Sequence, residues 1–381
     1  MNSTLNFSIS EASIYAMDLN KIIFSGLEID DTLVLKIEIA DNSNFTNSDV
    51  LDNTYYADAD GKIKINDLGQ LWNAHVLAWA PESEGVNASL KRRVYVRFTY
   101  TLGDTTASCT RTIIYSRRYI NKTPAEVAQF FPVLNRKKKT FFDSDEPLFA
   151  VNSSNTLNVG VAYIADSLTK WQEIALSPSA TGEIYDYYDL SPATVLNLLN
   201  TAISGSLTAT SLLYYDVYLL DAGGNELDDV RYDLQAINYP QRTELTFLNL
   251  LGVYETVPFL GLATNEPDRS AEYGYLGSDY GTVDLEVNDI YTLNSGYCNK
   301  KVMAQVRDML ESPFVYLHKE DEWHKITIID SSYKLDMPTN EAFNVSIKFR
   351  YADEIDNMST DITPWSAVDV FSKPPFDKSF E

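Results

Sequence analysis

The chain contains three histidines, His75, His318 and His324, which are the first residues to consider for metal or acid–base chemistry. His75 falls on the apolar face of a predicted helix, so we expect it to be packed in a core. His318 and His324 flank an acidic hairpin tip and, together with Asp321, could bind a metal ion. No cysteine or further histidine has ligand spacing, so the more economical reading is a solvated turn.

The acidic residues around Gly61 suggest calcium. Asp58, Asp60 and Asp67 surround this glycine, but a calcium loop needs a full set of twelve residues and a terminal glutamate, and both are absent. The alternative is a turn that requires glycine because the backbone has a positive φ. We expect the turn.

An acidic pair beside aromatic residues, Asp186 and Asp189 around Tyr187 and Tyr188, is a pattern seen in glycosidase clefts. Sequence spacing cannot set the separation between two carboxyl groups that such chemistry needs. The sequence has no nucleophile-elbow, Walker A or dinucleotide-binding motif, and Cys109 has no histidine near it in sequence. The prediction is a protein that is not an enzyme, with no catalytic, cofactor or metal site.

An internal repeat gives the plan of the elements that carry these residues. A strand-opening glycine occurs three times, at Gly61, Gly182 and Gly281. A short helix follows each glycine, over about 67–76, 191–203 and 300–311. A strand with a Val-Tyr core comes 33, 35 and 34 residues after the glycine, at Val94, Val217 and Val315. Repetition of this kind determines the domain plan.

The repeat predicts a mainly β protein of three tandem immunoglobulin- or fibronectin-III-like β-sandwich modules, each with a short helix. Two-layer α+β modules are the alternative. The expected segments are a first sandwich over residues 1–122, a helix and basic linker over 123–140, a second sandwich over 141–240, a divergent β-rich module over 241–356 and an extended C-terminal arm over 357–381.

The connecting segments carry recognisable local signals. Thr123, Pro124 and Glu126 combine an N-cap, an N1 proline and a capping-box glutamate, which predicts a short helix. Residues 136–139 form the best linker candidate. The C-terminal stretch has isolated aromatic residues that cannot form a core of their own, so it is either a disordered tail or an arm that lies on another subunit.

Charge is unevenly distributed. The net charge is −24, yet residues 91–139 hold 12 Lys and Arg against two acids. This segment is either a solvated basic linker or a face that meets the acidic body of a neighbouring subunit, whereas the acidic field of the whole chain opposes nucleic acid. The candidate partner-binding residues are Arg92, Arg93, Arg117, Arg118, Arg136, Lys137, Lys138, Lys139, Trp365, Phe371 and Phe376.

The sequence contains no apolar stretch of about 18 residues, which argues against a transmembrane helix. Its first residues lack the basic start and apolar core of a signal peptide. Two cysteines in different modules cannot form a disulfide framework. We therefore expect synthesis in a cytoplasm and no membrane partner.

Four stretches of the third module resemble virion and tail proteins of phages of gut Bacteroidetes, the crAss-like group among them. The stretches are Leu245–Gly252, Thr256–Gly261, Val315–Lys334 and Asn344–Ala352. The resemblance covers about residues 243–355 and rests on structural motifs, so it carries no active site.

The resemblance implies a virion structural protein of the tail, collar or baseplate, made in the cytoplasm of the host bacterium. Its partners would be further copies of itself, in a ring or symmetric oligomer, and other virion proteins. Two alternatives remain: a glycan-binding protein that uses exposed Tyr and Trp as sugar platforms, and a glycan depolymerase.

Overall fold

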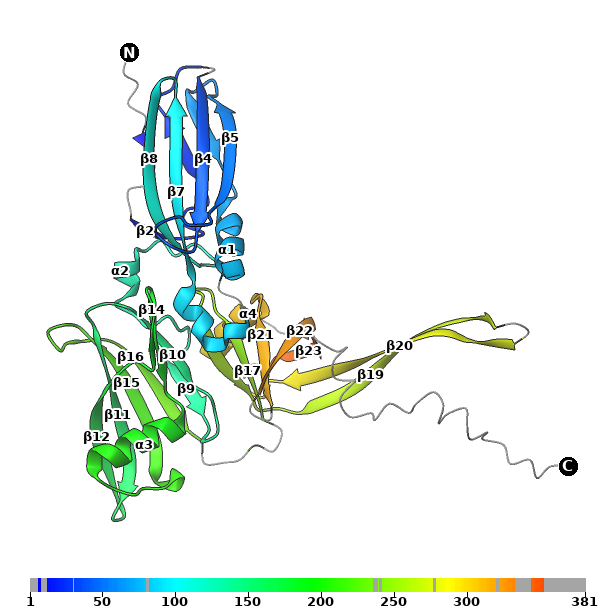
Figure 1. Cartoon of the computed structure of the whole chain (residues 1–381). Coiled ribbons are helices and arrows are strands. Elements are labelled where there is room, and N and C mark those ends of the chain that lie inside the picture. Colours follow the sequence, from blue (N-terminus) through cyan, green and yellow to red (C-terminus); the bar gives the residue numbers. More distant parts are fainter. Residues whose placement is uncertain are drawn as a thin grey trace. The chain divides into compact units, whose positions relative to one another are not determined.

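The computed structural model describes residues 6–7, 12–29, 31–79, 82–235, 239, 242–276, 279–319, 322–332 and 344–352. Figure 1 shows the chain, in which strands predominate. The predicted fold class, mainly β with immunoglobulin-like β-sandwich modules, is confirmed. The predicted arm and its residues Trp365, Phe371 and Phe376 lie outside the described residues, as do most residues of the acidic tip beside His318.

In the part of the chain that the structure describes, the first sandwich has eight strands in two sheets. One sheet has the order β1-β3-β6, and the other has the order β2-β8-β7-β4-β5. The strands are β1 (Asn6–Phe7), β2 (Ser13–Tyr15), β3 (Ile22–Ser25), β4 (Thr32–Ala40), β5 (Asp49–Tyr56), β6 (Lys62–Ile65), β7 (Arg93–Leu102) and β8 (Thr105–Ile114).

The second sandwich likewise has a three-stranded and a five-stranded sheet. Its sheets have the orders β10-β14-β13 and β12-β11-β15-β16-β9. The strands are β9 (Lys137–Thr140), β10 (Pro147–Val151), β11 (Thr156–Ala165), β12 (Leu168–Leu176), β13 (Ala180–Thr181), β14 (Tyr185–Asp189), β15 (Leu212–Leu220) and β16 (Glu226–Leu234).

The two five-stranded sheets have the same topology. In each, one edge strand pairs parallel with its neighbour, β2 with β8 and β9 with β16, and every other pair of neighbours is antiparallel. The order β2-β8-β7-β4-β5 therefore corresponds strand for strand to β9-β16-β15-β11-β12. This correspondence is what the repeated sequence landmarks predict for the first two copies.

A helix follows the equivalent strand in each sandwich, after β6 and after β14. The helices are α1 (Leu68–Trp79), α2 (Pro124–Val127), α3 (Pro192–Ile203) and α4 (Lys300–Leu310), with the 3-10 segments η1 (Glu82–Lys91) and η2 (Ala209–Ser211). The predicted caps are confirmed: Thr123 and Glu126 form a capping box at α2, and Ser191 caps α3 ahead of Pro192. Such caps satisfy amide donors that the first helical turn leaves free.

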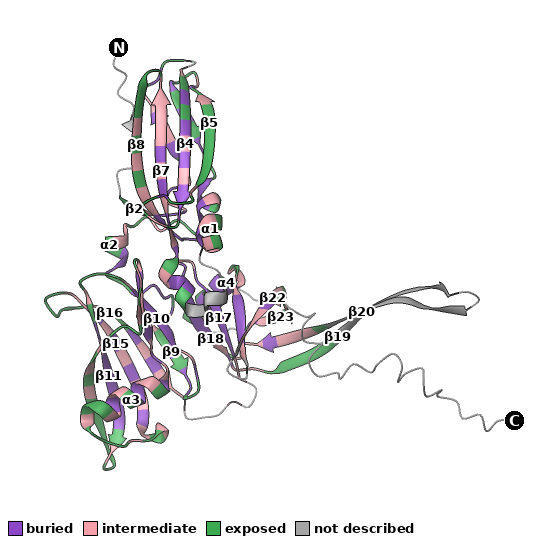
Figure 2. Cartoon of the chain, viewed as in Figure 1, coloured by how far each residue is buried: buried purple, intermediate pink, exposed green. Residues whose placement is uncertain are grey.

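The cores lie between the sheets of each sandwich, and Figure 2 shows the alternation of buried and exposed residues along the strands. In the first sandwich, Trp72 of α1 is fully buried and meets Phe98 of β7 edge to face at 6.1 Å between ring centroids. In the second, Tyr215 and Tyr232 stack at 4.8 Å on neighbouring strands. Large aromatic residues thus supply much of the apolar surface that each small core removes from water.

Contacts divide the chain into two compact units. The first holds Met1–Pro240, Glu244–Pro258 and Asn299–Pro313, and the second holds Gln241–Thr243, Phe259–Cys298 and Phe314–Glu381. Strands β17 (Thr243–Leu248) and β18 (Tyr254–Phe259) are hydrogen-bonded neighbours. The second unit has the strand order β21-β22-β23-β20-β19, built from β19 (Ala263–Leu276), β20 (Asp279–Asn294), β21 (Val315–Lys319), β22 (Glu322–Ser332) and β23 (Ser346–Tyr351).

The segment expected to be a linker is a strand. Residues 137–140 form β9, which pairs parallel with β16, and Lys138 and Thr140 point inward while Lys137 and Lys139 are exposed. A run of lysines favours solvent over a strand. Pairing with β16 overrides that preference because Asp228 and Asp233 lie near enough to neutralise Arg136 and Lys137.

Among the described residues, no helix combines the length and the apolar character needed to cross a membrane.

Gly61 is a landmark glycine that combines a positive φ with a close backbone approach, which leads to the first prediction. Its φ is +65°, and a Cβ there would lie 2.2 Å from the carbonyl oxygen of Leu27. Gly224 also has a positive φ, but a Cβ there would meet nothing within 4 Å. Gly224→Ala should cost only about 1 kcal/mol of unfolding free energy for its backbone conformation, and Gly61→Ala should cost at least about 1 kcal/mol more because its clash involves backbone.

Urea unfolding of both variants measures the difference. Equal losses would show that the close approach to Leu27 imposes no constraint on position 61.

Candidate functional site

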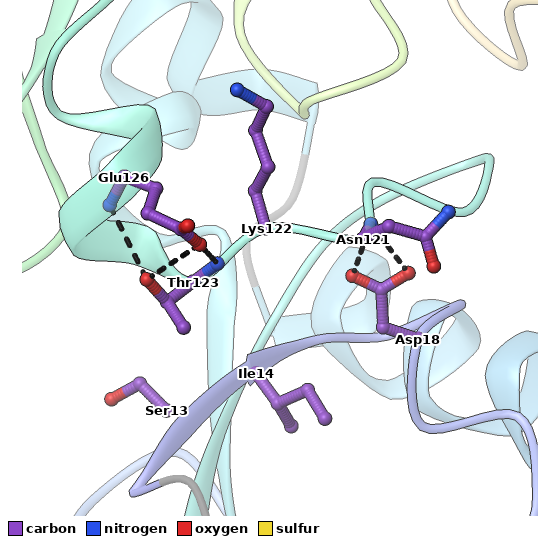
Figure 3. Close-up of a pocket in the computed structure, with 7 residues that line it drawn as sticks. All are labelled: Ser13, Ile14, Asp18, Asn121, Lys122, Thr123 and Glu126. Carbon is purple, nitrogen blue, oxygen red and sulfur yellow. Dashed lines mark hydrogen bonds between the residues drawn. The ribbon is translucent and has the colours of Figure 1, made fainter.

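A shallow pocket of about 220 Å³ lies in the first unit between the start of the first sandwich and the segment that leads to α2 (Figure 3). Its lining residues are Ser13, Ile14, Asp18, Asn121, Lys122, Thr123 and Glu126. Two carboxylates, one ammonium group and two hydroxyls thus lie around one hollow, which makes it the first place to look for chemistry.

Both carboxylates of the pocket are committed to backbone amides. Asp18 accepts hydrogen bonds from the N–H groups of Ile120 at 2.8 Å and Asn121 at 3.0 Å. Glu126 accepts from the N–H of Thr123 at 2.7 Å, and this bond holds the pKa of the Glu126 carboxyl below its usual range. The dashed bonds in Figure 3 show both contacts. The polar groups of the pocket therefore stabilise the start of α2 and the segment before it. The lining residues do not place a nucleophile beside a base.

The other sequence-predicted sites are structural. His75 is half-buried, with its Nδ1 2.9 Å from the carbonyl oxygen of Leu71 and its Nε2 3.5 Å from Asp49. Asp58 accepts from the N–H groups of Asp60 and Lys62, both at 2.9 Å, which is the turn reading rather than a calcium loop. Within the described part of the chain, no group of three or more His, Cys, Asp or Glu side chains is arranged to hold a metal ion.

The acidic pair beside Tyr187 does not form a two-carboxylate site. Asp186 and Asp189 lie three residues apart on strand β14, so they face opposite sides of it. Asp189 accepts from the N–H of Ser191 at 2.9 Å and from the hydroxyl of Thr194 at 2.8 Å, and so supports the start of α3. In the structure, Asp189 of this acidic pair stabilises the N-terminus of α3.

The basic segment is paired largely within the chain. Arg92 and Lys138 are buried, and Lys139 is exposed. The intramolecular ion pairs are Arg93–Glu183, Arg97–Glu38, Arg117–Asp308, Arg118–Glu311, Arg136–Asp228, Lys137–Asp233 and Lys138–Glu146. The acidic surface that these cations meet belongs to their own chain. That they also bind a neighbouring protein stays a prediction.

The pair between Arg117 and Asp308 is largely buried. Arg117 follows β8, and its guanidinium donates to a carboxylate oxygen and to the backbone carbonyl of Asp308 in α4. The second carboxylate oxygen accepts from the N–H of Leu250 at 2.9 Å. The Asp308 side chain is 3% exposed, and burial raises its pKa while Arg117 opposes that rise.

A second contact joins the two sandwiches at a more exposed position, where the Glu183 side chain is 54% exposed. Glu183, just before β14, accepts from both the guanidinium of Arg93 and the hydroxyl of Tyr95 on β7. Tyr185 donates through its hydroxyl to the carbonyl of Leu251 at 3.1 Å. We call the cluster of Arg93, Arg117, Glu183, Tyr185 and Asp308 the junction, since it ties the first sandwich, the second sandwich, the β17–β18 turn and α4 together.

A cluster of buried ionisable groups lies deeper in the first unit. Lys138 of β9 places its Nζ 3.9 Å from Glu146, and both side chains are 4% exposed. That distance allows an ion pair but is too long for a direct hydrogen bond. Burial, together with the carboxylates of Glu244 and Glu255, raises the pKa of Glu146 to about 8 despite the opposing effect of Lys138.

The remaining carboxylates of the cluster come from β17 and β18. Glu255 is fully buried, accepts from the amide nitrogen of Gln305 at 2.8 Å, and has a pKa raised by burial. Glu244 accepts from the hydroxyl of Ser144. The cluster can hold protons, and none of its residues lines the pocket of Figure 3. A glutamate in a strand of mostly apolar residues, at position 255, is the signal that the sequence offers.

The outer face of the five-stranded sheet in the second sandwich carries an aromatic group that the sequence analysis did not single out. Trp171 on β12 is 45% exposed and lies beside Tyr214 on β15, with 6.1 Å between ring centroids. No pattern along 168–176 alone marks it, because the residue against which the indole lies, Gly160, is on the neighbouring strand β11.

No family model and no curated protein matches the chain. Some solved structures overlap with it weakly. Invasin, a bacterial integrin-binding protein, is 9% identical and covers 76% of this chain and 56% of its own, with a TM-score of 0.23. The Bacteroides ovatus mixed-linkage glucan utilization locus protein SGBP-B, in complex with a heptasaccharide, is 11% identical and covers 89% and 76%, with a TM-score of 0.16.

A third overlap is with the four N-terminal Ig domains of Dscam1 isoform 7.44, at 8% identity, 74% and 67% coverage and a TM-score of 0.17. TM-scores of this size carry no argument about function. The β-sandwich assignment rests on the two pairs of sheets described above.

The junction predicts unequal costs for two neighbouring arginines. Arg117→Met leaves the buried carboxylate of Asp308 without its cation and should cost about 3–5 kcal/mol of unfolding free energy. Arg118→Met removes the more exposed pair with Glu311 and should cost at most about 1 kcal/mol. Chemical unfolding monitored by tryptophan fluorescence compares them, and similar losses for both variants would contradict the role given to the junction.

The buried cluster predicts a pH dependence of stability. Because the folded-state pKa of Glu146, about 8, exceeds its ordinary value, the folded chain keeps a proton that the unfolded chain releases. The free energy of unfolding should therefore fall as the pH rises from about 5 to about 8. Glu146→Gln should remove at least about 1 kcal/mol of this decrease.

Urea unfolding at pH 5.5, 7 and 8.5 measures the slope. Glu226→Gln, which alters an exposed carboxylate on β16, is the control. A slope that is unchanged in Glu146→Gln would show that this residue does not hold the proton.

Proposed function

We propose that the chain is a non-enzymatic structural component of a larger assembly, and that this assembly is the tail, collar or baseplate of a phage virion. The virion part of the proposal comes from the resemblance over about residues 243–355. The alternative of a glycan depolymerase has less support, because the acidic pair expected to serve it lies on opposite faces of β14.

The observation that carries the proposal is the ribbon formed by β19 and β20. The two strands have 14 and 16 residues and pair from Ala263 opposite Leu293 to Leu276 opposite Asp279. Among the described residues of β20, only 291–294 also pair with β23. In the described pairings, residues 279–290 have β19 as their one neighbouring strand, and Figure 1 shows the ribbon continuing past β23.

A ribbon of this kind is poorly explained by the stability of a single chain. Twelve strand residues extend about 40 Å, and an isolated two-stranded hairpin is at best marginally stable in water. Its two edges offer backbone donors and acceptors to a strand of another molecule. A contact with a neighbouring subunit would satisfy those groups and stabilise the ribbon.

The sequence of the ribbon also suits a role at an interface between proteins. Residues 263–294 contain seven acids and one arginine. So much negative charge opposes contact with nucleic acid or an anionic membrane and favours a neighbour with a basic surface. This charge is consistent with the expectation of protein partners and no membrane partner.

The internal ion pairs of the first unit support the same function. Arg117 and Asp308 join backbone segments that are far apart in sequence. The charges of these two side chains therefore stabilise the fold. A structural component needs such rigidity, because its binding surfaces must keep fixed positions within the unit.

The ribbon predicts how assembly should respond to its removal. A variant in which residues 268–288 are replaced by Asn-Gly keeps the pairing of Pro267 with Asp289 and loses the extension. Wild-type protein should sediment as a symmetric oligomer and appear as rings or a symmetric appendage in negative-stain images. The shortened variant should sediment as a monomer with unchanged near-ultraviolet circular dichroism.

Two results would count against the proposal. A wild-type chain that remains monomeric at every protein and salt concentration would contradict assembly. A shortened variant that assembles as well as the wild type would contradict the role of the ribbon.

A further inference from the structure

The outer face of the second sandwich contains a platform built around Trp171. A Cβ at Gly160 of β11 would lie 2.0, 2.7 and 2.9 Å from three atoms of the indole ring. The ring therefore lies directly against the backbone of β11, and only glycine leaves room for it. With 45% of the side chain exposed, the indole presents its other side to solvent while already held in place.

A second ring lies across the same strand. Trp171 and Tyr214 are both opposite Ala162, so the three side chains form one row across β12, β11 and β15. The planes of the two rings meet at 47°, and the guanidinium of Arg231 stacks 3.7 Å from the centroid of the Tyr214 ring. The stacked arginine restricts the side-chain conformation of Tyr214. Gly160 in turn leaves space for the indole of Trp171.

Polar groups occupy the next two rows along the strands. Glu173 and Asp216 lie opposite Gly160, and Tyr218 lies opposite Asn158. The side-chain amide of Asn158 donates to Glu173 at 2.8 Å. Burial and the nearby carboxylates, Asp216 first among them, raise the pKa of Tyr218 to about 12, so its hydroxyl keeps its proton at neutral pH.

The chemistry of this surface selects among ligand classes. The strands β11 and β15 each pair on both sides, so their backbone groups are not available to an added peptide strand. Glu173 and Asp216 beside the rings oppose an anionic polymer. Aromatic faces favour the C–H faces of sugar rings, and carboxylate and amide oxygens accept hydrogen bonds from hydroxyl groups.

We propose that this face, formed by Trp171, Tyr214, Asn158, Glu173 and Asp216, binds a neutral polysaccharide, with one sugar ring stacked on the indole and neighbouring hydroxyls donating to the carboxylates. The inference rests on the second sandwich alone and does not depend on the ribbon or on assembly. It adds glycan recognition, at a named site, to a structural protein.

The site holds its aromatic groups in place before a ligand arrives. Ordering a flexible side chain on binding costs about 0.5–1.5 kcal/mol for each side chain. The indole of Trp171 lies against the backbone of β11, and the Tyr214 ring is stacked by Arg231, so this cost is small. Extended polysaccharides suit a flat, open sheet face because successive sugars can lie along the rows of side chains.

Affinity gel electrophoresis tests the proposal with the full chain. Gels contain one soluble neutral polysaccharide each: mixed-linkage β-glucan, xyloglucan, galactomannan, arabinoxylan, dextran or α-mannan, with polygalacturonate as the anionic comparison. At least one neutral polymer should retard the wild-type chain. Trp171→Ala should weaken that binding at least tenfold, as measured by calorimetry with the same polymer.

Two further variants distinguish binding at this site from non-specific binding by exposed aromatic residues. Gly160→Ala keeps the tryptophan and displaces its ring, so it should also weaken binding. Tyr56→Ala removes a 68% exposed tyrosine from β5, the edge strand equivalent to β12 in the first sandwich, and should bind within twofold of the wild type.

Three outcomes would overturn the inference. No retardation by any neutral polymer would exclude it, as would retardation by polygalacturonate alone. Equal affinity of the wild type and Trp171→Ala would show that any binding occurs elsewhere on the chain.

Discussion

The buried ion pair between Arg117 and Asp308 is the interaction on which the first unit most depends. One carboxylate accepts from the guanidinium that follows β8 and from the N–H of Leu250 in the β17–β18 turn, while belonging to helix α4. A charge this deeply buried is costly unless it is fully paired. Loss of any one of the three segments would leave a buried charge unpaired, so the three segments stabilise one another. The junction in this way links the β-rich parts of the first unit.

The same principle explains the distribution of charge along the sequence. The basic segment and the acidic remainder are complementary, as the composition suggested, but Asp228, Asp233 and Glu183 supply the partners from within the chain. What the surface keeps is a net excess of acid. Most of the basic side chains form ion pairs within the chain and so hold its elements together. Only the unpaired acidic side chains of the surface are available to attract a partner.

Local signals in the sequence predicted much of the fold, because a cap such as Ser191 acts on its own helix. Signals that depend on distant pairing are not visible locally: the segment expected to be a linker forms β9, and Asp233, the partner of Lys137, lies about 90 residues away. The Val-Tyr landmarks mark equivalent strands but different ladder positions, since Tyr95 lies opposite Ala40 and Tyr218 opposite Asn158. The platform at Trp171 depends on the register of three strands, which spacing along one strand cannot reveal.

Duplication of a sandwich separates what the core must keep from what the surface can change. The inward positions of β7 and β15 are apolar in both copies, for example Val96 and Val217, because each must fill a core of the same kind. The outward positions answer to no such constraint: β5 is an exposed strand that ends in Tyr56, whereas β12 seats Trp171 over a glycine. A glycine inside a strand weakens that strand unless something packs on it. The indole of Trp171 packs on Gly160 and takes the space of the missing side chain, which explains why β11 can keep a glycine in its interior.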